Sequence, residues 1–177
     1  GKKVKTLFNF GDLVLPGETD PLPVMNYTLS DDESKVLLMT DYNPIYRHSF
    51  TADYYVYDLT TKELFPLSDG GSQRLATFSP DASKVAFMRD NNLFIKDLVT
   101  KEETQFTFDG LYNHIINGAP DWVYEEEFGF AQGFFWSPDN MKIAFYRFDE
   151  SNVKEFQMEI FDNLYPDWYS SNIPRLV

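Results

Sequence analysis

The 177-residue sequence is 43% hydrophobic and 18% aromatic, contains no cysteine, and has a formal net charge of −13 at pH 7. This acidity argues against nucleic acids and anionic membranes as partners, because affinity for phosphates comes mainly from Lys and Arg. It favours a cationic ligand, such as a free peptide amino terminus, or it simply keeps the chain soluble. The lack of cysteine excludes disulfides and thiolate metal sites. No apolar run reaches the ~18 residues that suggest a membrane-spanning helix.

Three segments of the chain repeat one pattern. Each has a short apolar strand, a Ser-Pro-Asp or Ser-Asp-Asp turn, a Lys and a second apolar strand. Pro fixes φ at the second turn position, and Ser and Asp accept local backbone hydrogen bonds. The segments are residues 27–39, 76–88 and 134–146, and their turn serines Ser30, Ser79 and Ser137 are 49 and 58 residues apart.

A further pair of strands follows each of the first two repeats. These pairs are residues 54–59 with 64–67, and residues 92–98 with 104–108. Four strands in roughly 50 residues are typical of a propeller blade. A β-sandwich could space short strands similarly, but it would not need the same turn at the same point of each unit. We therefore predict an all-β fold with about three blades, each a four-stranded antiparallel sheet, of an incomplete β-propeller.

Three blades are too few to close a propeller, which usually has 4–8. An open arc would expose strand edges and apolar blade faces. We therefore expect residues 1–177 to be one partial propeller domain from the N-terminal part of a longer protein. Association with other copies of the chain is the alternative.

Two insertions interrupt the repeats. Residues 41–53 lengthen the hairpin of the first repeat, and residues 113–133 lie between the second and third repeats. The second insertion predicts a short helix near residues 120–128, with Asp121 as the N-cap and Gly129 as the stop. Insertions in repeat proteins are often binding elements on a rigid frame.

The insertions also contain the candidate binding residues. Two of the consecutive carboxylates Glu125, Glu126 and Glu127 could converge on one ammonium group, although an exposed acidic helix start explains them as well. Arg47 could donate hydrogen bonds to a ligand carbonyl or carboxylate, or it could stack on a ring or pair with an Asp. On spacing alone, the structural explanations have better support than the binding ones.

Motifs for catalysis or for metal and cofactor binding are missing from the chain. There is no G-x-S-x-G, P-loop or H-E-x-x-H sequence. His48 and His114 lie in different segments, and the acidic turns lack the ligand spacing of an EF-hand. We therefore expect no catalytic residue, no metal and no cofactor in this chain.

The insertions resemble motifs of the dipeptidyl peptidase IV family. Asp121-Trp-Val-Tyr-Glu-Glu-Glu127 is similar to that family's D-W-V-Y-E-E-E motif, and the Phe-Trp-Ser-Pro-Asp run at Phe135 is similar to the family's sequence just C-terminal to that motif. Arg47-His-Ser-Phe-Thr-Ala-Asp-Tyr-Tyr-Val-Tyr-Asp-Leu59 resembles the family's R-H-S-x-T-A-x-Y-x-x-Y-D-L stretch. The resemblance covers most of the chain in the expected order.

The resemblance implies a substrate-recognition role. In this family an N-terminal eight-bladed propeller accompanies a C-terminal α/β-hydrolase domain, and the enzyme releases N-terminal Xaa-Pro or Xaa-Ala dipeptides. Glu126 and Glu127 would bind the ammonium group of the substrate, and Arg47 would bind the carbonyl of its penultimate peptide unit. The nucleophilic Ser and its Asp and His partners belong to the hydrolase domain, which is absent here. This chain alone should therefore be inactive.

The same resemblance implies a peptide with a free amino terminus as partner, and a homodimeric parent protein. The absence of cysteine differs from the disulfide-bearing animal members and indicates a bacterial protein, periplasmic or extracellular. Two alternatives remain, the first based on the repeats alone and the second on the acidic turns alone. One is a non-enzymatic propeller that serves as a protein-interaction module, and the other is a sugar- or calcium-binding array of blades.

Overall fold

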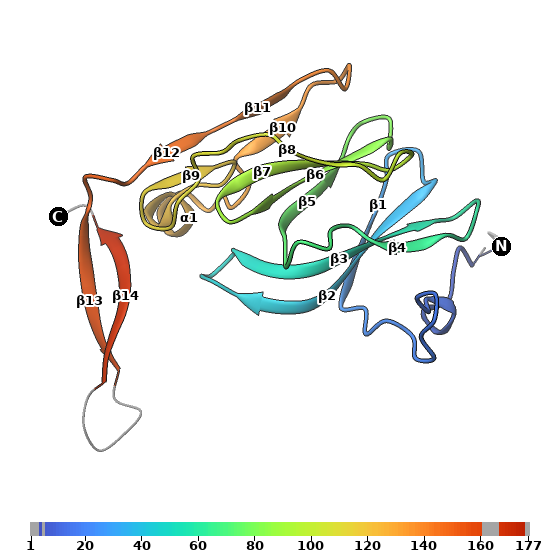
Figure 1. Ribbon diagram of the computed structural model, residues 1–177, viewed down its shortest axis with the longest axis horizontal. Coiled ribbons are helices and arrows are strands. Elements are labelled where there is room, and N and C mark those ends of the chain that lie inside the picture. The colour runs from blue at the N-terminus through green and yellow to red at the C-terminus, as the bar shows by residue number, and fades with distance from the viewer. Residues whose placement is uncertain (1–3, 5, 161–166, 176–177) are drawn as a thin grey trace.

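Two four-stranded antiparallel sheets form the frame of the molecule. The structure is a computed structural model, and it describes residue 4, residues 6–160 and residues 167–175. In both sheets the strands lie in sequence order, as expected for propeller blades. The first sheet contains β1 (Asn26–Leu29), β2 (Lys35–Pro44), β3 (Phe50–Asp58) and β4 (Leu64–Pro66), and the second contains β5 (Arg74–Phe78), β6 (Lys84–Arg89), β7 (Asn92–Asp97) and β8 (Glu103–Gln105) (Figure 1).

The third repeat and the residues on either side of it form two shorter pairs of strands. β10 (Phe134–Trp136) pairs with β11 (Ile143–Phe145), and β12 (Arg147–Asp149) pairs with β9 (Ile115–Asn117). Three backbone hydrogen bonds join the pairs: Gly118 N to Tyr146 O at 2.9 Å, Tyr146 N to Gly133 O at 2.8 Å, and Gly133 N to Gly118 O at 2.9 Å. A Cβ atom on Gly133 would lie 3.1 Å from the Gly118 carbonyl carbon, so this close approach of two backbones favours glycine.

A last hairpin extends away from the sheets. β13 (Lys154–Ile160) and β14 (Asp167–Arg175) pair with each other in antiparallel fashion, and their backbone projects from the rest of the fold (Figure 1). The predicted all-β propeller fragment is thus confirmed. The first two repeats form complete four-stranded blades with the strands that follow them, whereas the third forms only the β10–β11 pair.

The repeated turns share one hydrogen-bond pattern. Each turn serine donates to the aspartate two positions later and accepts from the backbone N–H of the following lysine. The Ser–Asp distances are 2.6 Å for Ser30–Asp32, 2.7 Å for Ser79–Asp81 and 2.5 Å for Ser137–Asp139. Hydrogen bonds from Ser30 and from the Ser34 backbone lower the pKa of Asp32 to about 2.

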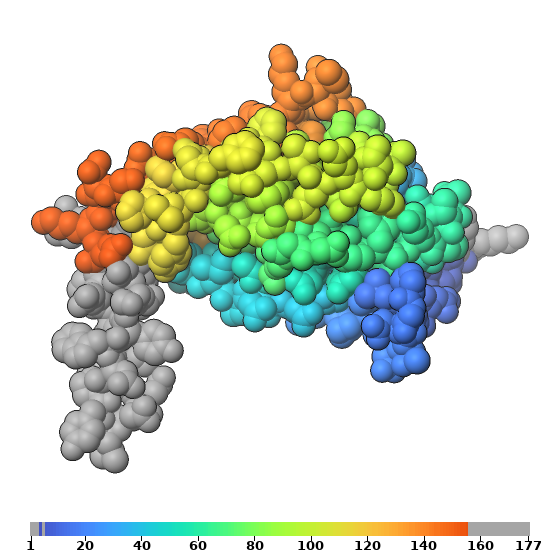
Figure 2. All heavy atoms as spheres, viewed as in Figure 1, coloured from blue at the N-terminus to red at the C-terminus, as the bar shows by residue number. Residues whose placement is uncertain are grey.

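The main core lies between the two complete sheets. Alternating residues of a strand point to opposite faces, so Leu37 and Met39 face the second sheet while Val36 and Leu38 face the N-terminal segment. From the second sheet, Phe87 stacks on Phe94 with ring centroids 5.6 Å apart. Figure 2 shows the second sheet, in yellow-green, lying directly against the first sheet, in teal. This packing gives both insertions a rigid base.

The predicted helix is present at the expected position. α1 (Trp122–Phe128) begins after Asp121, whose side chain accepts a hydrogen bond from Tyr124 N at 2.9 Å. It ends at Gly129, which adopts the left-handed conformation with φ of 70°. The short 3₁₀ helix η1 (Phe10–Asp12) lies in the N-terminal segment. Neither helix in the described part of the chain is long and apolar enough to cross a membrane.

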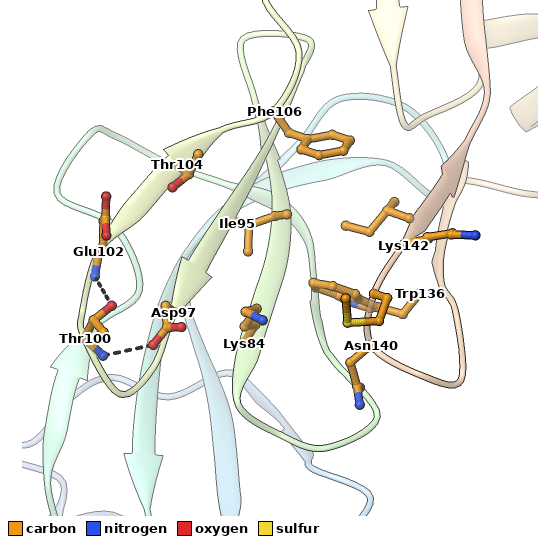
Figure 3. A pocket seen from close by; sticks show the side chains of 12 residues that line it. Lys84, Ile95, Asp97, Thr100, Glu102, Thr104, Phe106, Trp136, Asn140 and Lys142 are labelled. Carbon is orange, nitrogen blue, oxygen red and sulfur yellow. Dashed lines mark hydrogen bonds between the residues drawn. The ribbon is translucent and has the colours of Figure 1, made fainter.

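The turns and the insertions occupy opposite ends of the blades. The tip of the β2–β3 hairpin and α1 lie together on the left of Figure 1, and the Ser-Asp turns lie on the right. A groove of about 450 Å³ opens towards the turn end, between the second sheet and the β10–β11 hairpin (Figure 3). Its walls include Lys84, Ile95 and Asp97 on one side and Trp136, Asn140 and Lys142 on the other. The groove is therefore remote from the acidic helix.

Candidate functional site

The two insertions meet through the side chains of Arg47 and Glu126. Arg47 Nε donates a hydrogen bond to Glu126 Oε2 at 2.7 Å, although the residues are 79 positions apart. The Arg47 side chain is 70% exposed and that of Glu126 is 17% exposed. Two residues that sequence reasoning placed in one binding site are therefore in direct contact, and both can be reached by a ligand.

Glu125 connects the same two insertions from the inside. Its side chain is buried, and its Oε1 atom accepts hydrogen bonds from His48 N at 2.7 Å and from Ser49 N at 2.8 Å. Hydrogen bonds to an ionised acceptor are shorter and stronger than neutral ones. Glu125 thereby holds the backbone next to Arg47 against α1.

Helix geometry explains why the three glutamates differ. Residues three apart lie on the same helix face, so Glu125 points inward with the half-buried Trp122. Glu126 and Glu127 follow at steps of about 100° and face outward. Glu127 is exposed, and no residue in the described part of the chain donates a hydrogen bond to its side chain. The structure thus separates one internal carboxylate from two accessible ones.

The Arg47 contact keeps Glu126 ionised. The hydrogen bond from Arg47 lowers the pKa of Glu126, and the same contact raises the pKa of Arg47. Both groups are therefore charged at neutral pH. Two neighbouring carboxylates beside one guanidinium can bind a group that is itself cationic, with a carbonyl oxygen next to it.

Aromatic contacts fix the outer side of α1. The Tyr124 ring lies 5.1 Å from the Phe128 ring and 5.1 Å from the Phe148 ring, measured between centroids. Phe148 belongs to β12, so the helix packs against the β9–β12 pair as well as against the β2–β3 hairpin. The carboxylates therefore project from a helix supported on two sides.

The sequence from residue 30 to residue 171 matches the family model described as the dipeptidyl peptidase IV (DPP IV) N-terminal region. The chain belongs to the dipeptidyl peptidase IV family. Its fold agrees with this family, because a crystal structure of Porphyromonas gingivalis dipeptidyl peptidase 4 superimposes with a TM-score of 0.85 and 44% sequence identity. That match covers 97% of this chain and 24% of the P. gingivalis chain.

Fungal members of the family are also similar in sequence to this chain. A Penicillium rubens protein named "Probable dipeptidyl-aminopeptidase B" is 39% identical over 155 residues, which are 85% of this chain and 16% of that protein. A protein of the same name from Arthroderma gypseum is 41% identical over 143 residues, covering 78% of this chain and 16% of the relative. The chain thus spans about one sixth of the length of these peptidase relatives.

The described residues of this family member contain no group of three or more His, Cys, Asp or Glu side chains placed to hold a metal ion. His48 contributes its backbone N–H to Glu125, and the His114 ring contacts the Tyr112 carbonyl at 3.0 Å. Both histidines therefore have local contacts in separate segments.

The sequence did not predict that the three glutamates have different roles. It indicated only that Glu125 is one of three acidic residues, whereas in the structure Glu125 holds the backbone of residues 47–49, here called the Arg47 loop. The shared helix face of Trp122 and Glu125 was the available signal. Two further charged residues, the half-buried Arg74 and the buried Glu150, gave no sequence signal, because each lies in a segment without a motif.

Proposed function

We propose that this chain is the substrate-recognition part of a serine-type dipeptidyl peptidase that releases Xaa-Pro or Xaa-Ala dipeptides from peptide amino termini. The observation that best supports this function is the contact between Arg47 and Glu126, beside the exposed Glu127. Glu126 and Glu127 bind the substrate ammonium, and Arg47 binds the carbonyl of the penultimate peptide unit.

The charges at this site suit that role. An ammonium has three donors, and two ionised carboxylates can accept them together. Arg47 uses Nε for Glu126, and its Nη groups make no hydrogen bond to any described residue, so they can donate to a carbonyl oxygen. A site that binds the charged chain end fixes the distance from that end to the scissile bond, and this gives a dipeptidase instead of a general protease.

The catalytic Ser, Asp and His belong, in this proposal, to an α/β-hydrolase domain of the parent protein outside this chain. The relatives are several times longer than the chain, which leaves room for such a domain. The fragment alone would then bind but not hydrolyse peptides. We further propose that the parent is a homodimer, which analytical ultracentrifugation of the full-length protein would test.

The proposed location is the periplasm or exterior of a bacterium. The chain contains no cysteine, and the bacterial P. gingivalis enzyme is similar to it over 97% of its length. Fractionation of the source cells, with detection of the full-length protein, tests this assignment.

The decisive experiment measures hydrolysis of Gly-Pro-p-nitroanilide by the full-length parent and by its Glu126→Gln/Glu127→Gln variant. We expect the parent to cleave this substrate and the variant to lose about 100-fold or more in kcat/KM, since two charge-assisted contacts are removed. Asp31→Asn, in a Ser-Asp turn at the opposite end of the blades, is a matched control and should retain activity. Unchanged kcat/KM in the double variant would exclude the ammonium-binding role.

A further inference from the structure

A cavity of about 380 Å³ lies behind α1, on the inner side of Glu125. Both insertions and the segment after β12 contribute to it, with Ile45, Leu111, Ile116 and Trp122 among its apolar lining residues. The charged side chains in the same lining are those of Arg74 and of three acidic residues, Asp90, Glu125 and Glu150. The cavity is within the size range of small-molecule sites, which combine apolar walls with a few polar groups.

A strained stretch of backbone places Arg74 in this cavity. Arg74 is the first residue of β5, and the pairing of β5 with β6 shifts register between Arg74 and Thr77. Within this bulge Leu75 has a φ of 58°, a conformation that side chains of this size rarely adopt. Such bulges redirect side chains and are common next to functional sites.

Arg74 lacks an anionic partner among the described residues. Its Nε is buried without a hydrogen-bond partner, and no ion pair joins its guanidinium to a described carboxylate. Burial lowers the pKa of Arg74, and the nearby charge of Glu125 opposes this effect only in part. A buried Nε–H without an acceptor is unfavourable, so the half-buried Arg74 side chain can gain from an anionic group that enters the cavity.

Glu150 is the complementary group. It is 7% exposed, and no donor in the described part of the chain makes a hydrogen bond to its carboxylate. The Tyr46 ring belongs to the same lining and lies within electrostatic range of both Glu150 and Arg74. The cavity lining therefore holds one side chain that can pair with an ammonium group and one that can pair with a carboxylate.

We infer that this cavity binds a small zwitterion, either a free α-amino acid or a short peptide with free ends. Its carboxylate pairs with Arg74 and its ammonium with Glu150, while its side chain packs against the apolar walls. A planar guanidinium can bind a carboxylate through two parallel hydrogen bonds. This site is separate from the Glu126–Glu127 pair, and it does not depend on the proposed peptidase activity.

The test is calorimetric binding of L-leucine and of Ala-Pro to the full-length protein that contains Glu126→Gln and Glu127→Gln. These changes remove the proposed ammonium site on the surface of α1, so any remaining zwitterion binding that Arg74→Met weakens reports on the cavity. The C-terminal amides of both ligands serve as matched probes because they lack only the carboxylate. This comparison needs no change in the cavity, so it cannot be confused with misfolding.

We expect at least one acid to bind, and its amide to bind at least about tenfold more weakly, since a charge-assisted pair is lost. Arg74→Met should weaken the acid to a similar extent, whereas Arg147→Met, which removes an equal charge outside the cavity lining, should not. Binding of leucine identifies an amino-acid site, and binding of Ala-Pro alone identifies a peptide site. Equal affinity of acid and amide, or no binding of either acid, would overturn the inference.

Discussion

The two ends of the blades are stabilised in different ways. At the turn end, the hydrogen bonds of each Ser-Asp turn join residues two to five positions apart, and the same set occurs three times. At the insertion end, the bonds from the Arg47 loop to Glu125 and Glu126 join residues 76 to 79 positions apart and occur once. Hydrogen bonds between near neighbours in the sequence thus stabilise the turn end of the blades, and single long-range hydrogen bonds hold the candidate binding residues together at the insertion end.

The largest expected effect on stability comes from Glu125→Ala, which removes the hydrogen bonds between α1 and the Arg47 loop at the insertion end of the blades. It leaves two backbone N–H groups without an acceptor, which should cost about 3 kcal/mol in the free energy of unfolding. Hydrogen exchange of the His48 and Ser49 amides should accelerate strongly. Urea unfolding and amide exchange of the full-length protein measure both effects. The exposed Glu127→Ala is the control, and equal stability of the two variants would contradict this role of Glu125.

A smaller effect is expected for the pH dependence of stability, and it comes from Glu150, also at the insertion end. Burial and the charge of Asp121 raise the pKa of Glu150 to about 7 from its ordinary value of 4.5, which applies to the unfolded chain, while His114 acts in the opposite direction. Between pH 4.5 and pH 7 the Glu150 carboxyl group is therefore protonated to a greater extent in the folded state than in the unfolded state. The free energy of unfolding should therefore fall as pH rises from about 4.5 to 7, by about 2 kcal/mol.

The matched variant Glu150→Gln should remove this part of the pH dependence. Its stability relative to the parent protein should increase as pH rises, in thermal unfolding from about pH 4.5 to 8. Glu127→Gln, at an exposed position, should follow the parent. A parallel pH profile for Glu150→Gln and the parent would show that the carboxyl group does not titrate in this range.

The smallest expected effect is the difference in stability between variants of two copies of the Ser-Asp turn. Ser79→Ala should cost about 1 kcal/mol, because it removes a buried acceptor for Lys84 N and a donor to Asp81. Ser137→Ala removes the same bonds from a more exposed turn, so water can replace them and the cost should be lower. Urea midpoints of the two variants measure the difference. Equal costs would mean that burial does not distinguish the copies.

The sequence predicted the frame well for a physical reason. The Ser-Asp turns, the N-cap at Asp121 and the stop at Gly129 depend on neighbours a few residues away, so their chemistry is visible in the chain itself. Arg47 and Glu126 were placed in one site only through resemblance to a family. Spacing alone could not predict their contact, because it depends on how two blades pack.

The cavity behind α1 was beyond sequence reasoning for the same reason. Arg74 begins an ordinary strand, and only the register shift in β5 and the φ of Leu75 set its direction. Glu150 follows β12 at a position where an acidic residue is expected to be solvated. The surroundings of both side chains depend on the tertiary arrangement of segments that are far apart in the sequence.

The way Glu125 holds the Arg47 loop has a consequence for protein engineering. Its carboxylate contacts two main-chain N–H groups, and no hydrogen bond joins it to the His48 or Ser49 side chains. Residue 48, whose side chain is exposed, is therefore open to labels, probes or new ligand contacts without loss of the anchor. Proline is the exception at both positions, since it has no N–H to donate.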